Sequence, residues 1–301
     1  MDNLVTIIIP SYNHSRFIGY TIESIISQSY QNIELIIIDD GSTDNSIDII
    51  NNFKNTCIQR FRKFIFINRE NKGLCYTLNE GIKLSSGKYI SIIASDDIMH
   101  HDKTIEQVDY LEHNSECVGV FSGADIIKEN GTLLSSKNGT NVKYYFNDII
   151  LNQYQLFSPS AMYRLENMIK TGLYPTDIIL EDWYMNLKIT EKSGYLISLK
   201  KPLISYRRHS SNTSLQTARL HSDRQKILKL FENNILYKKA NLELTYTIAY
   251  ESVSFNKTRS VTYLLNSFLK NPFILFRRLT MVTIVKLFLP KKILNRRLTG
   301  K

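Results

Sequence analysis

Short apolar runs alternate with helix-like spacing in the N-terminal part of the chain. Residues Val5–Ile9 and Ile33–Ile38 are almost continuously apolar and rich in β-branched side chains, which is typical of strands in a parallel sheet covered on both faces. Between them, Ile18, Ile22 and Ile25 recur at the spacing that places side chains on one face of a helix. The pattern predicts a strand–helix–strand unit.

The same alternation continues toward Ile93. It predicts a helix over residues 45–53, a strand over Phe64–Ile67, a helix that carries Leu74 and Ile82 and ends near Gly87, and a strand over Tyr89–Ile93. Repeated units of this kind predict a doubly wound α/β fold with a mostly parallel sheet, in which ligands gather at the carboxyl ends of the strands.

The pattern weakens after the apolar run at Val118–Phe121. Residues 130–143 are polar and are expected to form loops or edge hairpins, whereas from His221 onward the spacing is helical, with a stripe of apolar side chains at Leu228, Phe231, Ile235 and Leu236. We therefore expect two parts: an α/β domain over residues 1–214 and a helical C-terminal extension over residues 215–301.

Charge is distributed unevenly. The net charge is +10, and residues 271–301 contain eight basic and no acidic side chains, so this tail carries +8 and the rest of the chain +2. A nearly neutral body gives no support to nucleic-acid binding, whereas a basic and apolar tail predicts contact with an anionic membrane surface.

The stretch Pro272–Pro290 is too short and too basic for a transmembrane helix. It is expected to be an interfacial anchor, with a helix packed on the body as the alternative.

Several features limit the class of protein. The three cysteines are scattered without Cys-x-x-Cys spacing, which favours a reducing compartment. The first residues lack the basic region and cleavage site of a secretory signal, so we expect the body to lie in the cytoplasm. Kinase, dehydrogenase, serine hydrolase and metalloprotease motifs are missing from the sequence, and those activities lose their main support.

Acidic residues follow two of the expected strands. The loop Asp39–Asp44 comes after the second strand, and it is either a turn with a helix cap or a group of ligands. Ser95, Asp96 and Asp97 follow the strand that ends at Ile93. Two adjacent carboxylates repel each other unless a cation or hydrogen-bond donors offset their charge. A divalent ion with oxygen ligands, Mg²⁺ or Mn²⁺, fits this pair, with a solvated turn as the alternative.

Two later segments carry further candidate groups. Glu181 and Asp182 precede Trp183 at an expected helix start, where acids are favourable without any catalytic role, although a carboxylate in a partly dry cleft can also act as a general base. The run Tyr206–Ser214 contains Arg207, Arg208 and His209, which together would suit a diphosphate.

Six segments, taken in order, resemble the motif series of the family 2 glycosyltransferases, which have a GT-A fold. They are Pro10–Asn13, Asp39–Asp44, Asn71–Gly73, Ser95–Asp97, Glu181–Trp183 and Tyr206–His209. The resemblance spans about Val5–Ser214. Single motifs are weak evidence, but six in the right order are specific.

The resemblance implies roles for individual residues. Nucleotide-binding roles fall on Pro10, Ser11, Tyr12, Asp40, Lys72, Asp96 and Arg207, with Arg208 as an alternative to Arg207 at the phosphates. The metal ligands would be Asp97, Asp96 and His209, binding Mn²⁺ or Mg²⁺, and Asp182 would be the base. Ala94 stands where many relatives have an acid, which leaves open whether Asp96 or Asp97 is the main ligand, and analogy favours Asp97.

The implied activity is an inverting hexosyl transfer from a nucleotide diphosphate sugar, UDP-glucose or UDP-galactose. The implied acceptor is a polyprenyl-diphosphate-linked saccharide, such as N-acetylglucosamine-diphospho-undecaprenol, in surface polysaccharide (O-antigen) biosynthesis. Such an enzyme would lie peripherally on the cytoplasmic side of the inner membrane. The alternatives are a non-catalytic nucleotide-sugar-binding or scaffolding protein of the same fold and a sugar-1-phosphate nucleotidyltransferase, whose glycine-rich N-terminal loop is absent from the sequence.

Overall fold

A computed structural model describes residues 3–209, 217–273 and 278–290. The chain divides into two compact units, one formed by Met1–Ile149 with Tyr154–Asn212 and the other by Ile150–Gln153 with Thr213–Lys301. The boundary expected near Ser214 lies outside the described residues. Each unit is described by itself below.

Parallel strands form one half of the sheet in the first unit. Strand β1 (Val5–Ser11) lies between β2 (Ile33–Asp39) and β4 (Tyr89–Ile92), and β2 pairs with β3 (Lys63–Asn68). The register joins Val5 to Ile33 and Ser11 to Asp39, so the strand ends lie level with each other. The alternating strand and helix pattern of the sequence is confirmed here.

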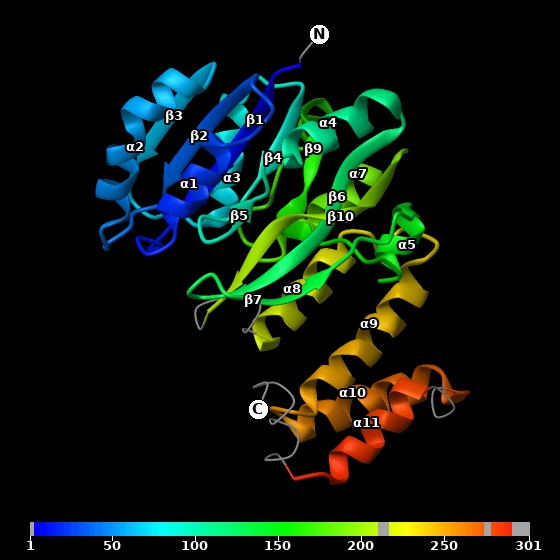
Figure 1. Ribbon diagram of the computed structural model, residues 1–301. Coiled ribbons are helices and arrows are strands. Elements are labelled where there is room, and N and C mark those ends of the chain that lie inside the picture. The colour runs from blue at the N-terminus through cyan, green and yellow to red at the C-terminus, as the bar shows by residue number, and fades with distance from the viewer. Residues whose placement is uncertain (1–2, 210–216, 274–277, 291–301) are drawn as a thin grey trace. The chain divides into compact units, whose positions relative to one another are not determined.

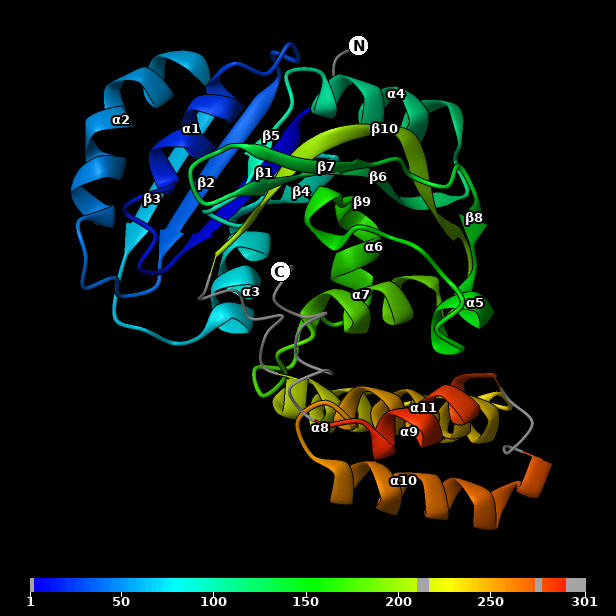
Figure 2. The same cartoon turned by 60° about the horizontal axis from the view of Figure 1, so that its bottom comes forward.

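Helices cover both faces of this half (Figures 1 and 2). The helices concerned are α1 (Ile18–Ile26), α2 (Ser46–Arg60) and α3 (Leu74–Leu84). Ile7 and Ile9 of β1 pack with Ile22 of α1 in the buried core, whereas Ile8 points to the opposite face and lies against Gly81 of α3. Alternate side chains of one strand therefore pack on different helices, which confirms the doubly wound α/β fold.

The second half of the sheet is mixed. Beyond β4 the order is β9 (Met162–Arg164), β6 (Cys117–Lys128), β10 (Tyr195–Arg208) and β5 (Ile98–Met99). The pairs β4–β9, β9–β6 and β10–β5 are antiparallel, and β6–β10 is parallel with register shifts. The polar stretch after β6 forms the hairpin strand β7 (Leu133–Lys137), which confirms the expected edge hairpin.

Smaller elements complete this unit. They are α4 (Lys103–His113), β8 (Lys143–Tyr144), α5 (Phe146–Ile150), the 3-10 helix η1 (Ser158–Ser160), α6 (Leu165–Lys170) and α7 (Glu181–Thr190).

The second unit is helical, as expected. Helices α8 (Thr217–Lys229), α10 (Lys257–Lys270) and α11 (Arg278–Phe288) pack on α9 (Tyr237–Ser252). The expected apolar stripe is wrong at Ile235, whose side chain is 95% exposed. Helix α8 ends at Lys229, so helical spacing does not extend to that position. Within the described ranges, no helix has both the length and the apolar character needed to cross a bilayer.

Candidate active site

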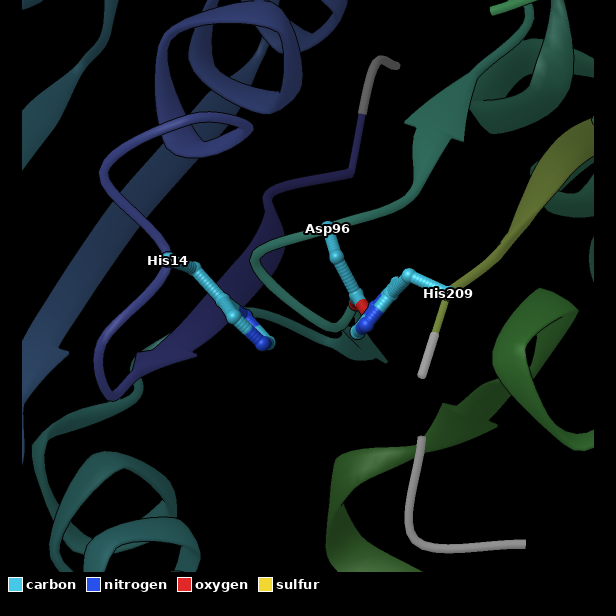
Figure 3. A group of neighbouring side chains, drawn as sticks. All are labelled: His14, Asp96 and His209. Carbon is cyan, nitrogen blue, oxygen red and sulfur yellow. The ribbon is translucent and has the colours of Figure 1, made fainter. Parts of the chain in front are cut away.

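The carboxyl ends of β1, β2 and β4 carry polar side chains that meet the end of β10. The loop after β1 contributes His14, the loop after β4 contributes Asp96, and His209 directly follows β10. Figure 3 shows these three side chains pointing toward one another from three separate segments. The doubly wound topology explains this convergence, because parallel neighbouring strands end at the same edge of the sheet.

His14, Asp96 and His209 form a cluster that could hold a metal ion, with one ligand atom from each residue within 4.8 Å of the others. Nε2 of His209 donates to Oδ2 of Asp96 at 2.6 Å, and these side chains are only 3% and 8% exposed. Nδ1 of His14 is hydrogen-bonded to Oγ of Ser95 at 2.7 Å. In proteins, a hydrogen bond at the ring nitrogen that does not bind the metal fixes the orientation of a metal-binding imidazole.

The protonation of His14 also suits a ligand. Burial lowers the pKa of His14 below its ordinary value, the Asp96 carboxylate opposes that shift, and His209 adds to it. The neutral imidazole, which has a lone pair for a metal, is therefore favoured. His14 was not among the residues selected from the sequence. The available signal was its place directly after the segment Pro10–Asn13.

Asp97 lies next to this cluster but has different surroundings. Its side chain is fully buried, Oδ1 accepts the backbone N–H of Arg207 at 2.9 Å, and Oδ2 has no hydrogen-bond partner among the described residues. Burial and the Asp96 charge raise the pKa of Asp97 well above its ordinary value. The candidate metal cluster among the described residues includes Asp96 and not Asp97.

Arg207 is buried against the loop after β4. Its Nε donates to the carbonyl of Asp96 and its guanidinium to the carbonyl of Glu129, both at 2.9 Å, and it lies over the ring of Phe17 at 5.1 Å. These contacts fix the loop that carries Asp96. Arg208, by contrast, is exposed.

A second group of side chains surrounds the end of β2. Asp39 accepts hydrogen bonds from Oγ of Ser11 at 3.0 Å and from the N–H of Ser42 at 2.8 Å. Tyr12 is 49% exposed beside Ser11, and Pro10 is half-buried at the end of β1.

Asp40 links this loop to the one after β3. It pairs with Arg69 and accepts the backbone N–H groups of Lys72 at 2.8 Å and Gly73 at 2.9 Å. Gly41 has φ +78°, and a Cβ there would lie 2.7 Å from the backbone nitrogen of Asn71, so the close approach of the two loops requires glycine. The exposed Lys72 ammonium lies over the Tyr76 ring at 4.8 Å.

Glu181 and Asp182 form the first turn of α7, and both are half-buried. Oδ1 of Asp182 accepts the N–H of Trp183 at 2.7 Å. The turn is anchored by its buried neighbours: Trp183 is 9% exposed, and Asn186 accepts the Tyr163 hydroxyl at 2.8 Å.

Sequence comparison places the chain among known glycosyltransferases. Residues 6–166 match the sequence model described as Glycosyl transferase family 2. An uncharacterized glycosyltransferase of Haemophilus influenzae is 31% identical over 79% of this chain and 75% of its own length. Another from Rickettsia bellii is 30% identical over 73% of this chain, and Glycosyltransferase GlyA of Streptococcus pneumoniae is 29% identical over 69%. The chain spans about a third (31%) of the length of each of these last two relatives.

Solved structures share the fold. S. aureus TarS 1–349 in complex with UDP-GlcNAc superposes with a TM-score of 0.65 at 15% identity, over 99% of this chain and 92% of that one. The mannosyltransferase PcManGT from Pyrobaculum calidifontis, in complex with GDP-Man and Mn²⁺, superposes with a TM-score of 0.58 at 14% identity, over 99% and 88%. At these identities the likeness shows the fold, which is of the GT-A type.

Proposed function

Because the chain belongs to glycosyl transferase family 2, we propose that it transfers a hexose from a nucleotide diphosphate donor to an acceptor hydroxyl with inversion at the anomeric carbon. The observation that carries this proposal is the cluster of His14, Asp96 and His209 at the carboxyl edge of the sheet, where β2 ends at Asp39 and Asp40 follows. This is the edge where α/β folds bind ligands.

The donor is proposed to be UDP-glucose or UDP-galactose. Neighbours of the same fold were solved with UDP-GlcNAc and with GDP-Man and Mn²⁺. We assign the nucleoside to Pro10, Ser11 and Tyr12, and the diphosphate to the Lys72 ammonium. Asp40 supports this assignment indirectly, because its carboxylate holds the backbone of Lys72.

Arg207 is proposed to act on the nucleotide through the loop after β4. Its guanidinium donates to the carbonyls of Asp96 and Glu129. It therefore positions Asp96, whereas the exposed Arg208 is proposed, beside Lys72, as a second cation for the phosphates.

For this cluster we propose Mn²⁺ rather than Mg²⁺, because two of the three ligand residues are histidines and Mg²⁺ takes oxygen ligands. We propose that Asp96, His209 and His14 would hold it, because their ligand atoms converge and Ser95 orients the His14 imidazole. Asp97 is the weaker candidate, because it is fully buried and does not belong to the group of converging ligand atoms. When bound, such an ion neutralises the charge that develops on a departing diphosphate.

Asp182 is proposed as the general base. The acceptor oxygen bonds to the anomeric carbon, the bond from that carbon to the diphosphate oxygen breaks, and the leaving diphosphate keeps the electron pair. The acceptor proton passes to Asp182. Attack opposite the leaving group converts an α-linked donor into a β-linked product. The half-buried position of Asp182 on the anchored first turn of α7 supports this role.

The acceptor is proposed to be a lipid-diphosphate-linked saccharide, such as N-acetylglucosamine-diphospho-undecaprenol, used in surface polysaccharide (O-antigen) synthesis. The enzyme would then work peripherally on the cytoplasmic side of the inner membrane. The concentration of basic residues in 271–301 supports this location, because anionic lipids attract basic segments.

A donor screen tests the proposal. The full chain is incubated with individual nucleotide sugars, Mn²⁺ and a lipid-diphosphate acceptor, and the product linkage is assigned by NMR. We expect β-linked product from a UDP-hexose and no product in EDTA. Tight binding of a nucleotide sugar without transfer to any acceptor or water would instead support a non-catalytic binding protein.

A further inference from the structure

An apolar groove runs between α10 and α11. Both helices pack on α9, and a groove of about 310 Å³ lies between them. It is lined chiefly by Val261, Leu264, Leu265 and Phe268 of α10 and by Ile284 and Leu287 of α11. The α10 residues repeat at helical spacing and form one continuous stripe. This volume is at the lower end of the range for ligand pockets, about 300–1,000 Å³.

The same helices expose further apolar side chains outside the groove. Met281, Val285 and Phe288 form a second stripe on α11 and are 56%, 61% and 84% exposed. Leu269 of α10 is 81% exposed. Contiguous apolar surface of this kind marks an interaction site for a membrane or another protein.

The positive charge of this region favours an anionic membrane over another protein as the partner. The sequence after Glu251 contains eleven basic residues and no acidic ones. Lys257, at the start of α10, donates to the carbonyl of Leu287, at 2.6 Å, so the two helices run antiparallel. The exposed Lys270 and Arg278 therefore lie at the opposite end of the groove, where α10 ends and α11 begins.

We infer that this face, defined as the groove with Lys270 and Arg278, docks on an anionic lipid bilayer, with an acyl chain in the groove and a lipid phosphate at the two cations. At one end of the groove Lys257 is engaged by backbone carbonyls, and at the other end Lys270 and Arg278 are exposed, so an apolar channel with exposed cations at one end matches the two parts of a phospholipid. Interfacial binding of this kind combines buried apolar area with attraction to anionic headgroups. The inference deepens the membrane location proposed above. It extends that location to α10, upstream of the basic tail.

Vesicle flotation of the full chain, without donor or acceptor, tests the inference independently of sugar transfer. Phosphatidylcholine vesicles with and without phosphatidylglycerol are compared. We expect binding to require phosphatidylglycerol. The groove variant Leu265→Gln with Phe268→Gln should bind vesicles at least about tenfold more weakly, because it removes apolar surface that the bilayer would cover. The charge variant Lys270→Glu with Arg278→Glu should weaken binding by at least as much, because basic residues near an anionic surface strengthen binding.

Matched controls come from the same unit. Ile235→Gln changes an apolar side chain that is 95% exposed, and Lys238→Glu with Lys239→Glu makes the same charge change at exposed positions of α9. Both should bind vesicles within about twofold of the unchanged chain. Val285→Ser with Phe288→Ser removes exposed apolar surface of α11 beside the groove without changing its lining. It should also weaken vesicle binding, so docking is tested even where the groove variant fails to fold.

Three results would overturn the inference. The first is equal binding to vesicles with and without phosphatidylglycerol. The second is a dimer that dissociates in the groove variant while vesicle binding persists, which would make a second copy the occupant. The third is binding that depends on a polyprenyl phosphate added to phosphatidylcholine and not on phosphatidylglycerol, which would make the groove a site for the acceptor lipid.

Discussion

His14 is the residue whose role the structure changes most. A single histidine in a loop gives little indication of metal binding, because isolated histidines are commonly solvated or structural. Its importance follows from Asp96 and His209, which are distant in sequence but whose ligand atoms lie within 4.8 Å of its own. Such proximity depends on tertiary structure, and a sequence pattern does not contain it.

Replacing His14 by glutamine should weaken metal binding by the free protein. The change removes one imidazole ligand, and even the loss of a residue that only orients a ligand costs about tenfold to a hundredfold in affinity. Mn²⁺ titration followed by electron paramagnetic resonance measures this without donor or turnover. His101→Gln, at an exposed position, is the control.

The same titration compares the two adjacent acids. Asp96→Asn should lose more Mn²⁺ affinity than Asp97→Asn, because Asp96 belongs to the group of converging ligand atoms and the fully buried Asp97 does not. The reverse order would return the main ligand role to Asp97, and unchanged affinity in His14→Gln would remove His14 from the site.

The variant Asp182→Asn distinguishes a catalytic role of the Asp182 carboxylate from a purely structural role in the first turn of α7. Asparagine keeps the size and the hydrogen bond to the Trp183 N–H but lacks basicity. As a base, Asp182 should contribute roughly a hundredfold to ten-thousandfold to turnover, with donor affinity near normal. Single-turnover rates and UDP-sugar affinity are measured together. A variant that binds donor normally and transfers at more than about a tenth of the original rate would make Glu181 the next candidate.

At the scale of elements, the loops after β2 and β3 behave as one structure. Asp40 connects them through Arg69 and through the backbone N–H groups of Lys72 and Gly73. The position of the Lys72 ammonium therefore depends on a carboxylate in the neighbouring loop.

Asp40→Asn should loosen both loops. It removes a charge-assisted contact with Arg69 in a largely buried place, which costs about 1.5–3 kcal/mol of unfolding free energy. Donor affinity should fall as well, while turnover at saturating donor changes little. Chemical denaturation and donor titration give the two quantities. Loss of donor affinity with unchanged stability would show instead that Asp40 contacts the donor directly.

The accuracy of the sequence prediction differs between the two halves of the sheet. Strands β1 to β4 were predicted because each is a short apolar run next to a helix with clear spacing. Beyond Val118 the pattern fails for physical reasons. Strand β9 has three residues, and β10 contains Lys200, Lys201 and Pro202 where its register against β6 shifts. The acids at strand ends could be predicted from position alone. Their hydrogen-bond partners could not.

At the scale of the whole molecule, a buried lysine makes the free energy of unfolding depend on pH. Lys103 of α4 is fully buried, and its ammonium donates to Oγ of Ser91 and Oε1 of Gln107, both at 2.8 Å. Burial lowers the pKa of Lys103 to about 7. Between that value and the ordinary lysine pKa near 10.5, the unfolded chain binds the proton and the folded chain does not. Stability therefore rises with pH across this window and is flat below it.

Lys103→Met should remove this dependence. Between pH 7 and pH 9 the free energy of unfolding of the unchanged protein should rise by about 2 kcal/mol relative to that of the variant. Well above the folded-state pKa, the rise is about 1.4 kcal/mol for each pH unit. Urea unfolding is followed by the fluorescence of Trp183, the one tryptophan of the sequence. Parallel curves for the two proteins would show that Lys103 keeps its charge when folded.

The position of His209 after β10 also affects a protein that is still being synthesised. His14 and Asp96 leave the ribosome early, but β10 is made after the other strands that the structure describes and lies between β6 and β5. A nascent chain stalled before Tyr195 holds only two of the three proposed ligands. With the proposed ligands, the metal site would therefore be complete only when the sheet is complete.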